Sequence, residues 1–182
     1  MLPHVPGMDD RLPRHALLLL LTACLLAGGR VQASELGRGP TFVAGTGWFD
    51  CNRRRDQAAE MRLEYRSRPR GPGLRAVAAT LATTDGSLFV GTGVAFELRL
   101  GSWDVTPTFV PGVYRQGDGR DLGYPLEFRS QLEIGHRLRG GPRIAFAFSH
   151  LSNAGLGSRN PGQESLTINY EWARSRRKGW DD

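Results

Sequence analysis

Alternation of apolar and charged side chains at every second position constrains the fold of this chain more than any other feature. Residues 128–138 show it most clearly, with mainly apolar side chains at even positions and mainly charged or amide side chains at odd ones. The same pattern runs through residues 59–66, 94–100 and 166–172. Successive side chains of a β-strand point to opposite faces, and no segment after Ala33 shows a helical period. The sequence therefore predicts an all-β protein whose strands each have one apolar and one charged face.

The start of the chain has the features of a cleavable signal peptide. Arginine residues precede an apolar block at residues 16–27, and residues 31–33 (VQA) resemble a cleavage site. The block is too short for a membrane-spanning helix, which needs about 20 apolar residues. We therefore expect export, with residues 1–33 as the signal peptide and residues 34–182 as one mature domain.

The two cysteines leave a second interpretation of this leader open. Residues 21–24 (LTAC) also match a lipoprotein signal, in which Cys24 would become a lipidated N-terminus. If cleavage follows Ala33 instead, Cys51 is the only cysteine of the mature chain. It then has no partner for an intramolecular disulfide.

Export and long amphipathic strands together favour a transmembrane β-barrel over a soluble sandwich. In such a barrel the apolar side chains face lipid, the charged side chains fill the interior, and closure leaves no strand edge exposed. Aromatic residues at the ends of the apolar faces suit an interfacial girdle. They are Trp48, Phe128, Tyr170 and Trp172.

Turn signals divide the mature chain into the strands of an eight-stranded antiparallel barrel. The predicted strands are 41–50, 57–67, 74–84, 87–100, 103–115, 124–138, 142–153 and 164–174. An even count places both termini, and the short turns at Gly101 and Gly140, on the periplasmic side. Side chains fill the interior of a barrel this small, so no pore is expected.

The last predicted hairpin carries the residue types of a serine hydrolase. His150 and Ser152 are two apart in one strand and so point the same way. Glu164 begins the next strand after a Gly/Asn/Pro-rich connection. All three share the parity of the apolar positions, which places them on the lipid-facing side near the outer end. Polar groups on such a stripe are costly and indicate function, so we expect a lipid substrate.

The chemistry of these residue types predicts their roles. A serine hydroxyl needs a base within hydrogen-bond reach, and His150 is placed to take the proton of Ser152 and to return it to the leaving group. Glu164 would fix the imidazole tautomer. The side chain of Asn153 and the backbone N–H of Gly155 lie next to the nucleophile and are predicted to stabilise the oxyanion.

The segment FSHLSNAGLGSRNPGQESL, residues 148–166, resembles the signature of the outer-membrane lipid A 3-O-deacylase family (PagL), through H-x-S-N-A-G followed by N-P-G-x-E. The resemblance implies an outer-membrane enzyme that hydrolyses the ester-linked hydroxyacyl chain at position 3 of lipid A, with no cofactor and no metal. The residues that it implies are a triad of Ser152, His150 and Glu164, an oxyanion hole of Asn153 and Gly155, and a supporting Asn160.

The resemblance also implies partners. Lipid A of lipopolysaccharide is the expected substrate, the outer membrane is the expected location, and a homodimer is left open. The net charge of +6 suits nucleic acid as well as an anionic membrane, but export excludes nucleic acid. Arginines of the outer loops either hold lipid A phosphates or face water. They are Arg53, Arg54, Arg55, Arg120 and Arg159.

Two other classes of function are compatible with the pattern. One is a non-enzymatic small outer-membrane barrel, structural or adhesin-like, in which the hydrolase residues occur together by chance. The other is a soluble periplasmic β-protein. One feature departs from the usual outer-membrane barrel, because the chain ends in a charged tail, residues 174–182, instead of a terminal aromatic residue.

Overall fold

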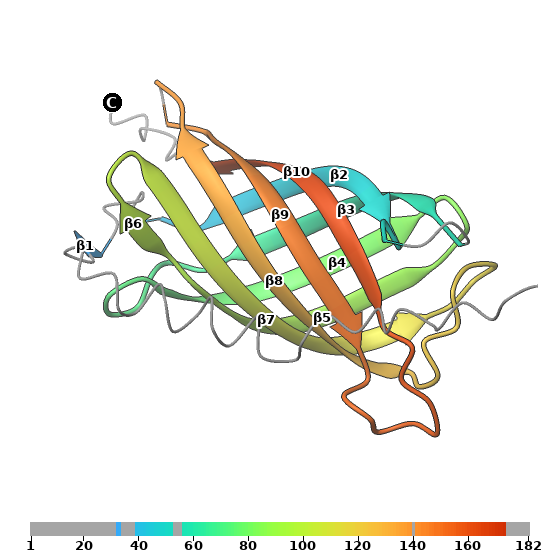
Figure 1. Cartoon of the computed structure of the whole chain (residues 1–182). Coiled ribbons are helices and arrows are strands. Elements are labelled where there is room, and N and C mark those ends of the chain that lie inside the picture. Colours follow the sequence, from blue (N-terminus) through green and yellow to red (C-terminus); the bar gives the residue numbers. More distant parts are fainter. Residues whose placement is uncertain (1–31, 34–38, 53–55, 140, 174–182) are drawn as a thin grey trace, which may run out of the picture. The chain divides into compact units, whose positions relative to one another are not determined.

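The computed structural model describes residues 32–33, 39–52, 56–139 and 141–173, which form an antiparallel β-sheet closed into a barrel (Figure 1). Its strands are β1 (Gln32–Ala33), β2 (Thr41–Phe49), β3 (Ala58–Arg66), β4 (Leu74–Thr83), β5 (Leu88–Phe96), β6 (Leu98–Leu100), β7 (Trp103–Arg115), β8 (Leu126–Arg137), β9 (Arg143–Ser152) and β10 (Gln163–Ala173). β10 returns to pair with β2, and β7 pairs with β8, so the ring is complete. Eight strands make up the ring, since β6 continues β5 and β1 lies outside the ring. The prediction of an all-β, eight-stranded antiparallel barrel is therefore confirmed.

The predicted strand 87–100 is divided at Glu97 into β5 and β6. The division is local, since the Glu97 N–H still donates to the Gly73 carbonyl oxygen at 3.0 Å. β1 was not predicted. The pairing of β4 with β5 ends at Leu74 and Phe96. β6 therefore has one edge that β4 does not cover, and Gln32–Ala33 pairs with this edge.

The two ends of the barrel differ in the length of their connections. Residues 50–57, 84–87, 116–125 and 153–162 connect the strands at one end, which we call the loop end. The opposite end, which we call the turn end, carries the connections 67–73, 101–102 and 138–142. β2 begins and β10 finishes at the turn end, as expected for an even number of strands.

The charged or polar faces of β3, β8 and β10 point into the barrel, whereas the inward faces of β2 and β5 carry no charged side chain. In β3 the side chains of Glu60, Arg62 and Glu64 are buried, whereas Met61 and Leu63 are 71% and 58% exposed. The same alternation holds along β8, β9 and β10. This arrangement is the reverse of a soluble sandwich and suits a barrel surrounded by lipid.

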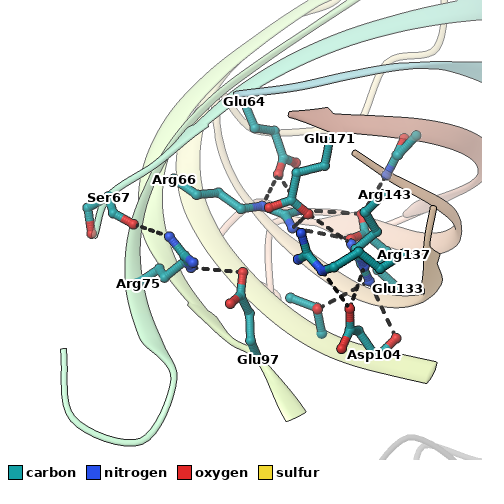
Figure 2. A network of polar contacts seen from close by, with 12 residues as sticks. Glu64, Arg66, Ser67, Arg75, Glu97, Asp104, Glu133, Arg137, Arg143 and Glu171 are labelled. Atoms are coloured by element: carbon teal, nitrogen blue, oxygen red, sulfur yellow. Dashed lines mark hydrogen bonds and ion pairs between the residues drawn. The ribbon is translucent and has the colours of Figure 1, made fainter. Parts of the chain in front are cut away.

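Ion pairs fill the half of the interior nearer the turn end (Figure 2). Arg66 contacts three carboxylates, those of Glu64 at 2.9 Å, Glu133 at 3.2 Å and Glu171 at 3.4 Å. Arg143 also contacts Glu133 and lies 3.1 Å from Glu171, so two guanidinium groups share two carboxylates. Further pairs are Arg75–Glu97 at 2.8 Å, Arg99–Asp104 at 3.1 Å and Arg129–Glu64 at 2.5 Å. Opposite charges in direct contact offset the cost of removing each group from water.

An apolar cluster lies in the interior, with most of its members toward the loop end. Its members are Phe49, Ala58, Val77, Ala79, Leu81, Phe89, Ala95, Val110, Tyr114, Leu122 and Leu151. Leu122 belongs to the connection 116–125 and Leu151 to the end of β9, and both are almost fully buried. The connection 116–125 is therefore anchored in the barrel through the apolar contacts of Leu122.

Aromatic residues of the predicted girdle lie on the outer surface. At the turn end the Phe42 ring lies 5.5 Å from Tyr65 and 6.0 Å from Trp172, and the Tyr170 ring lies 5.8 Å from Trp172. Trp48, nearer the loop end, is 66% exposed. Rings at both ends of an apolar band are typical of membrane–water interfaces.

Two predictions concern residues beyond this description. The signal peptide falls almost wholly on residues 1–31, and the charged tail falls on residues 174–182, both outside the described residues. Within the described part of the chain, no helix has the length and hydrophobicity needed to span a bilayer.

Replacing Glu133 by alanine tests the interior ion pairs, since it removes a carboxylate that Arg66 and Arg143 share. Two buried guanidinium groups then lose a counter-charge, and we expect the free energy of unfolding to fall by about 3–5 kcal/mol. Urea unfolding of the refolded barrel in detergent measures this change. Met61→Ala on the outer surface is the control. Equal losses in the two variants would contradict the stabilising role of the ion pairs.

Candidate active site

β9 and β10 place three of the predicted site residues on the outer face of the barrel at the loop end. His150 and Glu164 are directly opposite each other in the β9–β10 ladder. Ser152 ends β9 and shares the face of His150, along with Phe148, which is 42% exposed. The predicted outward orientation of all three side chains agrees with the burial patterns of both strands.

A direct contact joins the histidine and the glutamate. His150 Nδ1 lies 3.0 Å from Glu164 Oε1, and the two side chains are 43% and 17% exposed. In the neutral imidazole, an Nδ1–H that donates to the carboxylate leaves Nε2 with a lone pair. The contact therefore selects the tautomer that a general base requires.

Ser152 makes no hydrogen bond to the imidazole in the described part of the chain. Side chains two apart along one strand lie on the same face, and catalytic hydrogen bonds in unliganded sites are often long and tighten only with substrate. The structure thus brings His150 and Glu164 together and leaves Ser152 beside them on the same surface.

Buried neighbours hold each outward-facing residue in place. Leu151, between His150 and Ser152, is 0% exposed and belongs to the apolar cluster. Gln163 and Ser165 flank Glu164 and are also buried. The Gln163 Oε1 accepts from the Asp50 N–H at 3.3 Å, and Ser165 Oγ donates to Glu60 Oε2 at 2.5 Å. Contacts inside the barrel thus fix the backbone from which the site residues project.

Asn153 is buried, and its side chain ties two loops together. Its Nδ2 donates to the carbonyl oxygens of Leu122 and Arg159, each at 2.8 Å. Its Oδ1 accepts from the Gly155 N–H at 2.9 Å, and its own backbone N–H donates to Asn160 Oδ1 at 3.1 Å. Asn153, Gly155 and Asn160 are therefore brought together as predicted, but the donors of Asn153 and Gly155 point at protein oxygens.

The loop arginines have different surroundings. Arg120 is buried and lies 2.7 Å from Asp50, so it supports the loop end from inside and does not face a lipid headgroup. Arg159 is exposed and pairs with Asp121, which joins the connections 116–125 and 153–162 at their surface. Residues 53–55 lie outside the described residues.

Cys51 lies beside the site without the properties of a nucleophile. Its backbone N–H donates to the Glu164 carbonyl oxygen at 2.9 Å. Burial, together with the nearby Glu164 carboxylate, raises the pKa of the Cys51 thiol above its ordinary value. A raised pKa keeps the group as an unreactive thiol near neutral pH. No cluster of metal-ligating side chains is found among the described residues.

One polar residue next to the site was missed by the sequence prediction. Ser130 of β8 is the cross-strand partner of His150 and has the outward parity of Leu132 and Ile134. Its signal was present in the sequence, because a serine interrupts an otherwise apolar stripe. Only the register between β8 and β9 reveals that this serine faces the histidine.

Comparisons with known proteins agree with this geometry. The model of a family described as lipid A 3-O-deacylase (PagL) matches residues 48–173, which include the whole site. The crystal structure of the outer membrane enzyme PagL is similar, with 18% identity, 74% of this chain and 99% of that chain covered, and a TM-score of 0.55. A de novo designed transmembrane β-barrel has 6% identity, covers 75% and 96%, and gives a TM-score of 0.56. These structures support the fold, and no curated protein matches the chain.

Replacing Asn153 by alanine tests whether its side chain holds the two loops together. The variant loses three hydrogen bonds, one buried and two partly buried. A loss of about 1–3 kcal/mol in local stability follows, so the loops open roughly 5- to 160-fold more often. Trypsin cleavage after Arg159 is expected to accelerate by a similar factor while the barrel stays intact on gels. Ser152→Ala, which touches none of these bonds, is the control, and equal cleavage rates would refute the contact as a loop clamp.

Proposed function

Because the chain belongs to the lipid A 3-O-deacylase (PagL) family of outer-membrane β-barrel hydrolases, we propose that Ser152, His150 and Glu164 carry out its reaction as a catalytic triad. The observation that carries this proposal is the His150–Glu164 contact at 3.0 Å on the outer face of the barrel, with Ser152 beside it. The substrate is lipid A, and the non-enzymatic and soluble alternatives no longer apply.

The first half of the proposed reaction forms an acyl-enzyme. The Ser152 hydroxyl attacks the carbonyl carbon of the acyl ester while its proton passes to His150 Nε2. When the tetrahedral intermediate collapses, the bond from the carbonyl carbon to the sugar oxygen breaks. His150 then gives its proton to that leaving oxygen. Glu164 keeps the ring in the required tautomer and stabilises the imidazolium that forms.

The second half releases the fatty acid. Water attacks the acyl ester of Ser152 and gives a proton to His150 Nε2. Collapse of this intermediate breaks the bond to the serine oxygen, which recovers its proton from the imidazole. The products are a 3-hydroxy fatty acid and a lipid A one chain shorter, and every proton is accounted for without a cofactor.

The oxyanion is proposed to be stabilised by Asn153 and Gly155. In the unliganded site, Asn153 Nδ2 donates to Leu122 and Arg159, and the Gly155 N–H donates to Asn153 Oδ1. A small rotation of this segment on substrate binding would exchange one of these bonds for a bond to the oxyanion, which is worth about 3 kcal/mol. Asn160 supports the segment through its bond to the Asn153 N–H.

The position of the triad supports entry of the substrate from the side. Its residues leave the wall outward at the loop end, next to Phe128 and Phe148 of the lipid-facing surface. A lipid held in the outer leaflet of the outer membrane brings its ester to this height without leaving the bilayer. A homodimer stays a prediction.

Replacing Ser152 by alanine is expected to abolish deacylation, because no acyl-enzyme can form. Ser130→Ala is the matched control, since Ser130 also faces outward beside His150. Mass spectrometry of lipid A from expressing cells should show the loss of one hydroxyacyl unit with the wild type and with Ser130→Ala, but not with Ser152→Ala. If Ser152→Ala keeps its deacylase activity, or if only Ser130→Ala loses that activity, Ser130 becomes the better candidate nucleophile.

Replacing Glu164 by alanine should slow deacylation less than replacing Ser152. An orienting carboxylate contributes less than the nucleophile, so roughly 10–100-fold more activity should remain than in Ser152→Ala. Initial rates on purified lipid A in detergent measure the difference. If both variants lose deacylation equally and Glu164→Ala also lowers the stability of the barrel, the carboxylate mainly stabilises the β9–β10 hairpin.

A further inference from the structure

The backbone of Gly162 lies against the ring of His150. A Cβ added at this glycine would lie 2.8 Å from His150 Cε1 and 3.4 Å from Nε2. Real Cβ atoms essentially never come within 3.0 Å of another atom in this way. We propose that Gly162 is a positioning residue of the active site, whose missing side chain leaves the space in which the catalytic imidazole sits.

The contact lies on a specific edge of the ring. Cε1 is the carbon between the two ring nitrogens, and Nδ1 is the nitrogen that contacts Glu164. Gly162 precedes Glu164 by two residues, so one short segment supplies both the carboxylate and the surface against which the ring rests. With Nδ1 bound and Cε1 covered, Nε2 remains the ring nitrogen available to Ser152. This inference rests on the proposed triad and adds the element that sets the orientation of its base.

Any side chain at position 162 therefore acts directly on the imidazole. The overlap must be relieved by a shift, and the side chain of His150 is the group that can move, since the Leu151 carbonyl oxygen, at 3.6 Å from the added Cβ, is in ordinary contact. A displaced ring loses its alignment with Glu164 or with Ser152. A misplacement of about 1 Å in a catalytic group can cost about 100-fold in rate.

Backbone strain must be separated from this overlap, because Gly162 has a φ of +59°. L-residues other than glycine rarely adopt such a φ. The chain offers a close match in Gly71, at the turn end, with a φ of +57° and no atom within 4 Å of an added Cβ. Gly71→Ala thus introduces nearly the same backbone strain with no overlap and far from the site.

The test compares Gly162→Ala with Gly71→Ala in the refolded full-length enzyme acting on purified lipid A. Gly162→Ala should lower kcat by about 100-fold with KM nearly unchanged, because the base is misplaced while lipid binding is preserved. Gly71→Ala should keep kcat within about twofold, as expected for a site distant from the chemistry. Equal effects of the two variants, wild-type kcat in Gly162→Ala, or a change in KM alone would overturn the proposal.

Gly162→Asn provides a second variant, since asparagine tolerates a positive φ better than alanine but carries the same Cβ. A lowered kcat in both Gly162 variants supports the overlap with the ring. A wild-type kcat in Gly162→Asn would mean that backbone strain alone lowers kcat in Gly162→Ala, and it would overturn the proposal. Proton NMR of the Nδ1–H of His150 gives an independent readout. Its hydrogen-bonded signal should be displaced or lost in Gly162→Ala and kept in Gly71→Ala, and an unchanged signal in Gly162→Ala would also overturn the proposal.

Ser152→Ala separates this proposal from the triad itself. If Ser152→Ala is inactive and Gly162→Ala is fully active, the triad stands and the positioning role of Gly162 fails. If Ser152→Ala is active, the proposed function fails first, whatever Gly162→Ala does.

Discussion

The buried ion pairs between arginines and carboxylates decide the architecture of this protein. Arg66 and Arg143 share Glu133 and Glu171 inside the barrel, with side chains that are at most 3% exposed. Charges on one strand face are tolerable out of water only when opposite charges meet them. Closing the sheet brings Glu133 and Glu171 to Arg66, in addition to Glu64 of its own strand. The same closure turns the apolar stripes of β3, β8, β9 and β10 outward, while a separate apolar cluster is buried inside. Side chains fill the interior of a barrel this small, so we expect a site for a lipid on the outer wall.

That outer site depends on the interior for its geometry. His150, Ser152 and Glu164 project outward, but Leu151, Gln163 and Ser165 between and beside them are buried in the barrel. The loops above are joined to the same framework, through Leu122 in the apolar cluster and through the Asn153 side chain. The barrel thus holds the residues of the proposed triad at its outer surface by burying their nearest neighbours in the interior.

Much of this was predictable because strand periodicity is simple. The alternation across 59–66 and 128–138 correctly gave the barrel and its charged interior, and the spacing of His150 and Ser152 gave their common face. The division at Glu97 and the pairing of β1 could not be predicted, since they depend on where β4 stops. Contacts set by register or loop packing were also beyond the sequence: Ser130 opposite His150, Arg120 buried against Asp50, and the bonds that occupy Asn153.

We propose that Ser152 is reactive and faces the bilayer from the outer wall of the barrel. The most direct measurement is covalent trapping in reconstituted membranes with two fluorophosphonates, one carrying a long acyl chain that partitions into the bilayer and one that is water-soluble. Peptide mass spectrometry then locates the adduct. We expect an adduct on Ser152 that forms faster with the acyl probe and disappears in His150→Ala. An adduct on another residue, or faster trapping by the soluble probe, would contradict it.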